Sequence, residues 1–169
     1  MLRMRFAPQT IPALWRRAVT LGTLDHFRHL ARGAPPSGVR VQGEMKRIVI
    51  KAGAVAVAAE LNNSPTAAAI WRELPISGSA TTWGEEIYFP IPVSCDLESS
   101  ARDVVELGDL GYWPPGRAFC IFFGKTPISA PGEIRAASAV TVVGRVLGDP
   151  KSLLEVRDGE AVRLEGIPE

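Results

Sequence analysis

The chain has 169 residues, of which 46% are hydrophobic and 22% charged, a composition typical of one globular domain. No uninterrupted apolar run reaches the roughly 18 residues that a membrane-spanning helix needs, so no membrane segment is expected. Two cysteines, Cys95 and Cys120, make neither a disulfide framework nor a metal site, and reduced thiols predict a cytoplasmic protein without bound metal.

Charge divides the chain into two unequal parts. Residues 1–44 contain seven arginines and no lysine against two acidic residues, a net charge of +5, whereas residues 45–169 contain 12 basic and 16 acidic residues, a net charge of −4. We therefore predict a basic, flexible N-terminal extension followed by a folded domain. The extension, with an amphipathic helix across residues 11–30, is similar in composition to a transit peptide or a nucleic-acid-binding arm. We favour a third interpretation, a non-native extension upstream of a natural start at Met45.

The first elements of the domain are a β-hairpin and a helix. Residues 46–51 (KRIVIK) and 54–61 (AVAVAAEL) are β-branched or alternating runs that predict two paired strands. Ser64 and Pro65 are typical of a helix start, and Pro75 predicts its end. The apolar side chains between them share one helix face: Ala67, Ile70, Trp71 and Leu74.

The next stretch, residues 76–93, predicts a strand. In a regular strand one face carries Trp83, Glu85, Ile87, Phe89 and Ile91, and the other carries Glu86, Tyr88 and Pro90. Gly84 can host a bulge that breaks this alternation, and the prolines predict an edge or rim.

The remaining elements are predominantly strands. They are predicted at residues 104–106, at Tyr112-Trp113, at 117–123, at 139–147 and at 161–165, with a loop over 124–137 and a short helix over 151–156 after Asp149-Pro150. The apolar run at 117–123 predicts a strand that is buried on both faces. About eight strands and two short helices without βαβ alternation predict a mainly β protein, a closed or nearly closed antiparallel eight-stranded barrel.

Three segments carry a resemblance to a known family. They are TTWGEEIYFPIPV (81–93), VVELGDLGYWPPGRAFCIFFGKTP (104–127) and ASAVTVVGRV (137–146). With these motifs, residues 45–166 resemble a prokaryotic family of small cyclophilin-like domains of unestablished activity. The resemblance implies a cyclophilin-like closed β-barrel and does not include the N-terminal extension.

Histidine is missing where catalysis by this fold would need it. Both histidines, His26 and His29, precede Met45, which excludes Ser–His and Cys–His pairs and imidazole zinc sites within the domain. The prolyl isomerases of the cyclophilin fold use an arginine near aromatics, a glutamine and a histidine. No matching motif is found, and Arg117 is the basic residue nearest to the aromatic cluster.

Turn residues and aromatics define the candidate site. Seven residues are candidates for ligand binding: Trp83, Glu85, Glu86, Tyr112, Trp113, Phe122 and Lys125. Tyr112 and Trp113 could equally well pack at the barrel end. Since adjacent strand residues face opposite ways, Glu85 beside Trp83 is preferred to Glu86.

Two classes of function follow from these residues. The first is a module that binds a small molecule or peptide in an aromatic and acidic groove. The alternative is an enzyme, either a weak prolyl isomerase or a carboxylate-dependent catalyst using Glu85. No cofactor is expected, the acidic domain is not expected to bind nucleic acid, and the oligomeric state is left open.

Overall fold

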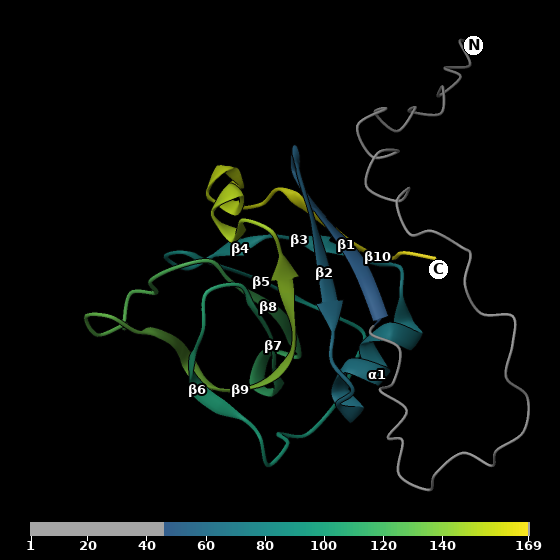
Figure 1. Ribbon diagram of the computed structural model, residues 1–169, viewed down its shortest axis with the longest axis horizontal. Helices are drawn as coiled ribbons and strands as arrows, with labels where there is room; N and C mark the ends of the chain where they lie inside the picture. Colours follow the sequence, from purple (N-terminus) through teal and green to yellow (C-terminus); the bar gives the residue numbers. More distant parts are fainter. Residues whose placement is uncertain (1–45, 169) are drawn as a thin grey trace, which may run out of the picture. The chain divides into compact units, whose positions relative to one another are not determined.

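The computed structural model describes residues 46–168, which form one antiparallel β-sheet and three short helical segments (Figure 1). The strands are β1 (Lys46–Ala52), β2 (Val55–Leu61), β3 (Ile76–Ser79), β4 (Thr81–Thr82), β5 (Glu86–Pro90), β6 (Arg102–Val105), β7 (Asp109–Trp113), β8 (Ala118–Phe122), β9 (Ile134–Leu147) and β10 (Ala161–Gly166). The helical segments are α1 (Pro65–Glu73) and the 3₁₀-helices η2 (Pro114–Gly116) and η3 (Pro150–Glu155). The predicted N-terminal extension (residues 1–44), its helix at 11–30 and the predicted start at Met45 lie outside the described residues.

The protein is mainly β and its sheet is antiparallel, as predicted, but the sheet has ten strands and is not closed. Its strand order is β3-β10-β1-β2-β9-β7-β8-β5-β4, and β6 pairs separately with β9. The two end strands, β3 and β4, follow each other in the chain, so the sheet curls round until its ends approach each other at Ala80. Within residues 46–168 β3 and β4 do not pair, and the predicted eight-stranded closed barrel is replaced by a curled open sheet.

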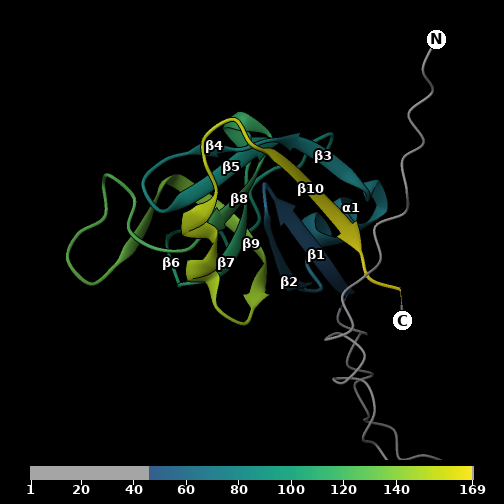
Figure 2. The same ribbon diagram turned by 90° about the horizontal axis from the view of Figure 1, so that it is seen from above.

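Local patterns account well for the first elements. Strands β1 and β2 form the predicted hairpin, in register from Lys46 opposite Leu61 to Ala52 opposite Val55. Helix α1 begins after Ser64, whose Oγ accepts a hydrogen bond from the backbone nitrogen of Ala67 at 3.1 Å. Its apolar stripe packs on the sheet core. Figure 2 shows α1 beside β1 and β10, away from β6.

Two predicted elements differ in detail. The strand predicted over residues 76–93 is divided into β3, β4 and β5, and Gly84, which has a positive φ of 63°, turns the chain between β4 and β5. The helix predicted over 151–156 is the 3₁₀-helix η3, and Asp149 Oδ1 accepts a hydrogen bond from the backbone nitrogen of Lys151 at 2.9 Å. No helix among residues 46–168 has the length and apolar character needed to cross a bilayer.

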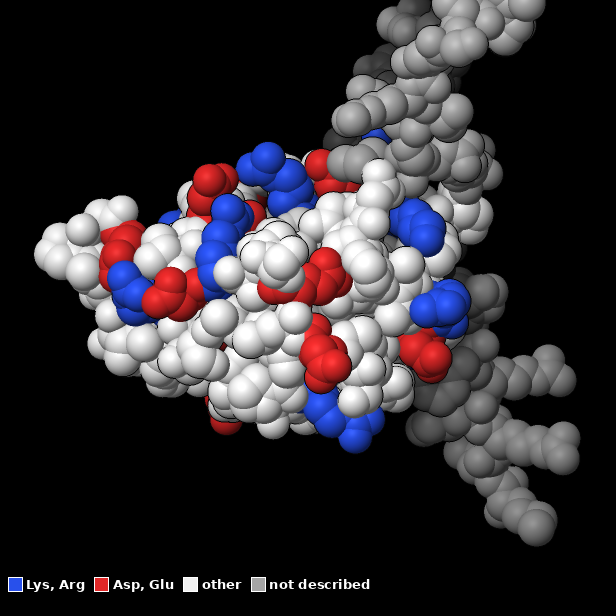
Figure 3. Space-filling view, turned by 90° about the horizontal axis from the view of Figure 1, so that it is seen from below, with Lys and Arg blue, Asp and Glu red and all other residues white. Residues whose placement is uncertain are grey.

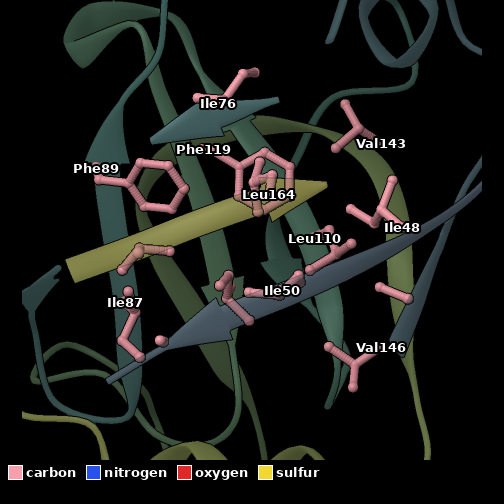
Figure 4. Packing of buried hydrophobic residues seen from close by; sticks show 14 of the residues in the cluster. Ile48, Ile50, Ile76, Ile87, Phe89, Leu110, Phe119, Val143, Val146 and Leu164 are labelled. Atoms are coloured by element: carbon pink, nitrogen blue, oxygen red, sulfur yellow. The ribbon is translucent and has the colours of Figure 1, made fainter. Parts of the chain in front are cut away.

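Strand β8 is buried along its whole length, as predicted, and separates two apolar clusters. Phe119 and Ile121 point into the main core, which fills the curl of the sheet together with side chains such as Ile50 and Leu110 (Figure 4). Cys120 and Phe122 point the other way. They form a second, smaller cluster whose other buried members are Val105, Ala136 and Val140.

Strand β9 is the long element that covers this second cluster. Its 14 residues pair first with β6, then with β7 and finally with β2. Gly144 lies where the pairing of β9 passes from β7 to β2. A glycine is required there, because a Cβ atom on Gly144 would lie 2.1 Å from the carbonyl oxygen of Glu60. The first half of β9 therefore leaves the main core and, with β6, builds a wall over the far face of β8 (Figure 1).

Candidate functional site

A pocket of about 120 Å³ lies on the face of β5 and β8 that is turned away from the main core. Eight residues line it: Trp83, Glu86, Tyr88, Trp113, Cys120, Ala136, Ala137 and Val140. They come from the turn before β5, from β5 itself, from the last residue of β7, from the middle of β8 and from the first half of β9. Residues far apart in the sequence thus share one small apolar cavity containing a single carboxyl group.

Strand register brings the floor of the pocket together. In the β5–β8 ladder Tyr88 lies opposite Cys120, and Glu86 lies opposite Phe122. In the β7–β8 ladder Trp113 lies opposite Ala118, on the same face as Cys120. The Glu86, Tyr88 and Trp113 side chains therefore project from one side of the sheet.

Aromatic rings form much of the wall. Tyr88 and Trp113 make an edge-to-face contact, with ring centroids 6.4 Å apart and ring planes at 75°. The indole nitrogen of Trp113 donates a hydrogen bond to Ser138 Oγ at 2.7 Å, which fixes the orientation of the ring. Its backbone is extended, with φ −107° and ψ 103°, as expected for a residue before proline.

The turn at Gly84 places Trp83 and Glu86 at the same pocket. The backbone nitrogen of Trp83 donates to the carbonyl of Glu86 at 2.9 Å, and the backbone nitrogen of Glu85 donates to the carbonyl of Lys125 at 2.9 Å. A Cβ atom on Gly84 would lie 2.7 Å from that Lys125 oxygen. Trp83 was predicted on the face of Ile87, and the turn moves it to the side of Glu86 instead.

Glu86 is the unusual group of the pocket. Its residue is only 5% exposed, and among the described residues its Oε2 atom has no hydrogen-bond partner. Burial raises the pKa of this carboxyl from 4.5 to about 7, with the Cys120 thiol opposing part of the rise. The pKa of Cys120 is raised in turn by burial and by the neighbouring carboxylate, so its thiol stays protonated at neutral pH.

The structure places Glu86 in the pocket lining and Glu85, the preferred carboxylate, outside it. Glu85 lies outside the pocket, where its Oε2 accepts hydrogen bonds from Lys151 Nζ at 2.8 Å and from the backbone nitrogen of Lys125 at 3.0 Å. The Lys151 ammonium lowers the pKa of Glu85. The cause of the reversal is the turn at Gly84, which rotates Glu85 outward and lets β5 begin at Glu86.

The other predicted site residues take structural positions. Lys125 is exposed and does not line the pocket. Tyr112 lies in the main core on the other face of β7, and its hydroxyl donates to the Val93 carbonyl at 2.8 Å. Phe122 is fully buried in the second cluster, on the same face of β8 as Cys120, and does not line the pocket. The structure therefore brings together three of the seven predicted residues: Trp83, Glu86 and Trp113.

Sequence reasoning missed five lining residues. Tyr88 could have been found, because it follows Glu86 by two positions on one strand and so shares its face. Cys120 could have been found from the alternation of β8. Ala136 and Ala137 were assigned to a loop, and Val140 to a strand of unknown partner, and no local signal shows that β9 folds over β8.

The face of the molecule that Figure 3 shows carries charges of both signs. On that face lysine and arginine side chains interleave with aspartate and glutamate around a largely uncharged area. Among residues 46–168 no group of three histidine, cysteine, aspartate or glutamate side chains could hold a metal ion. The chemistry available in the pocket is therefore a titrating carboxyl group among aromatic rings.

Comparisons with known proteins agree on a family. The sequence model of the family described as cyclophilin-like matches residues 46–165. Among solved structures, the solution structure of a hypothetical protein from Archaeoglobus fulgidus is similar, with a TM-score of 0.64 and 44% sequence identity. The match covers 74% of this chain and 99% of that one. The search of curated proteins gives no match.

Proposed function

This chain belongs to the cyclophilin-like family, and we propose that it binds a small organic molecule in the pocket between Trp83, Glu86 and Trp113. One observation carries the proposal: Glu86, whose buried Oε2 has no hydrogen-bond partner among the described residues, lines a cavity together with aromatic side chains. An unsatisfied buried polar group costs about 1–3 kcal/mol. A ligand that donates a hydrogen bond to Glu86 recovers that energy and also buries the rings.

The size of the pocket supports a small ligand. Since an engineered apolar cavity of about 150 Å³ binds benzene, a space of about 120 Å³ suits a ligand of roughly four to six non-hydrogen atoms. An extended peptide could insert only one side chain into such a space. We therefore propose a small molecule, or a small terminal group of a larger one, as the occupant.

A fragment screen tests this function. We expect fragments of about four to six non-hydrogen atoms to raise the melting temperature of the full chain, because a ligand that binds the native state stabilises it. The Trp113→Ala variant should lose these shifts. Glu85→Gln is the matched control, since it removes a neighbouring carboxyl that lies outside the pocket. Equal shifts in Trp113→Ala and the wild type would contradict the proposed site.

A second candidate function, acid–base catalysis, is favoured by the pKa of Glu86. A pKa of about 7 suits a group that both takes and gives a proton at neutral pH. If the pocket is catalytic, fragments that bind should be converted by the wild type and not by Glu86→Gln, as followed by NMR. Unchanged fragment signals after prolonged incubation would exclude catalysis on them.

Prolyl isomerisation has weaker support. Fold alone does not carry function, and the eight lining residues include no arginine. Arg117, the residue considered for that role, is exposed and follows η2. Uncatalysed isomerisation of a proline peptide takes tens to hundreds of seconds, and we expect the protein not to shorten this time. A clear acceleration would restore the isomerase hypothesis.

A further inference from the structure

We propose that the occupant of the pocket is a small organic cation, such as an alkylammonium group, held by the Glu86 carboxylate within the aromatic wall. This inference rests on the proposed function, because it names the class of ligand for the same pocket. Two features of the described residues carry it: the Glu86 carboxyl, which gives the lining its charge and whose Oε2 is unpartnered, and the aromatic side chains that line the same pocket.

The charge of the lining favours a cation. Glu86 is the one residue among the eight lining residues that can carry a full charge at neutral pH, since Cys120 is held in its thiol form. Lysine, arginine and histidine are missing from the described lining. The nearby ammonium of Lys151 is occupied by Glu85 outside the pocket. A positive ligand therefore meets an opposite charge, and an anion meets a like charge.

Aromatic side chains line the pocket beside that carboxyl. Tyr88 and Trp113 stand nearly perpendicular at 75°, so that they form a corner, and Trp83 adds a third aromatic side chain to the lining. Aromatic faces attract ammonium groups, and aromatic cages are a common way to bind alkylated amines. The hydrogen bond from Trp113 to Ser138 holds one wall of the corner in place before the ligand arrives.

The unpartnered carboxyl oxygen of Glu86 offers the cation a hydrogen-bond acceptor. Glu86 Oε2 is unpartnered among the described residues, and an ammonium donor satisfies it with a charge-assisted hydrogen bond. A neutral alcohol can also donate to this oxygen, but it carries no charge of its own and so gains less from an ionised Glu86 than an ammonium does. A carboxylate ligand can bind only when Glu86 is protonated and acts as the donor.

Cation binding is consequently coupled to the loss of a proton from the Glu86 carboxyl. The titratable side chains that face Glu86 in the pocket are Cys120 on β8 and Tyr88 on β5; β7 and β9 contribute the non-titrating Trp113, Ala136, Ala137 and Val140. With a pKa of about 7, about one carboxyl in eleven is ionised at pH 6 and about ten in eleven at pH 8. Affinity for a cation should therefore rise about tenfold from pH 6 to pH 8, whereas affinity for an anion should fall.

Three probes of similar size distinguish the ligand classes: n-propylammonium, 1-propanol and propionate. Each is titrated into the full chain while NMR follows the indole N–H signals, with Trp83 and Trp113 reporting on the pocket and Trp71 on α1 as an internal control. We expect propylammonium to shift the two pocket signals and not that of Trp71, with about tenfold tighter binding at pH 8 than at pH 6. Glu86→Gln should abolish this response, and Glu85→Gln should retain it.

Several outcomes would contradict the proposal of a cationic ligand without contradicting the proposal that the pocket binds a small molecule. These are tighter binding of propanol or propionate, undiminished propylammonium binding by Glu86→Gln, or affinity that falls as the pH rises. A lack of response to all three probes also contradicts the proposal of a cationic ligand, and the fragment screen then decides separately whether the pocket binds other molecules.

Discussion

Replacing Glu86 by glutamine should remove a pH-dependent loss of stability that the wild type carries. The unfolded carboxyl releases its proton near pH 4.5, and the buried native carboxyl does so only near pH 7. Between these values the native state binds more protons than the unfolded state, so the free energy of unfolding falls as the pH rises. Above about pH 7 both states are ionised and this contribution becomes constant.

The magnitude follows from the rise in pKa. At about 1.4 kcal/mol per pH unit, a rise from 4.5 to about 7 corresponds to about 3 kcal/mol. Glutamine has nearly the same shape as a protonated glutamate and does not ionise. We therefore expect Glu86→Gln to unfold with a similar free energy to the wild type at about pH 5, and to become about 2–3 kcal/mol more stable relative to it by about pH 8.

Urea denaturation followed by tryptophan fluorescence measures this difference across the pH range. Carboxyls with lowered pKa values, such as Glu85 and Glu165, contribute stability that is lost only as the pH falls through their native pKa values. They are present in both proteins and cancel in the difference. Glu85→Gln, whose ion pair is largely exposed, should follow the wild-type profile to within about 1 kcal/mol. A constant difference between Glu86→Gln and the wild type from pH 5 to pH 8 would refute the reasoning.

Three further substitutions test the scaffold around the pocket. Tyr112→Phe should lower the free energy of unfolding by about 1–3 kcal/mol, because the Val93 carbonyl loses its donor in the core, and a neutral effect in urea denaturation would contradict this. Ser64→Ala removes the N-cap of α1 and should cost about 1 kcal/mol by the same assay; a change near zero would show that the cap is dispensable. Gly84→Ala combines a positive φ with a contact 2.7 Å from the Lys125 oxygen, and should cost more than about 1 kcal/mol and weaken probe binding. Unchanged binding would show that the turn does not position the pocket.

Features that depend on short stretches of chain were predictable from the sequence. The N-cap at Ser64, the β1–β2 hairpin and the two-sided burial of β8 each follow from residues within a few positions of one another. Their physical causes, a hydroxyl that satisfies free backbone donors and a strand period of two, act locally. The family was also recognisable from the sequence.

The site was only partly predictable, because one dihedral angle and one long-range pairing decide it. The positive φ of Gly84 exchanges the roles of Glu85 and Glu86, and the sequence offers a bulge there without stating its direction. The wall of the pocket comes from β9, whose pairing with β6, β7 and β2 depends on contacts between distant segments. Alternation alone cannot reveal which strand covers Cys120.

Strand β8 has a consequence for how such a protein can diversify. Its odd-numbered residues Phe119 and Ile121 belong to the main core, whereas Cys120 belongs to the cavity floor on the opposite face. Substitutions at alternate positions of one strand therefore affect separate properties, the packing of the main core on one side and the shape of the pocket on the other. A protein engineer could vary Cys120, Tyr88 and Val140 as a library and leave the main core untouched. One backbone can in this way support relatives that recognise different molecules.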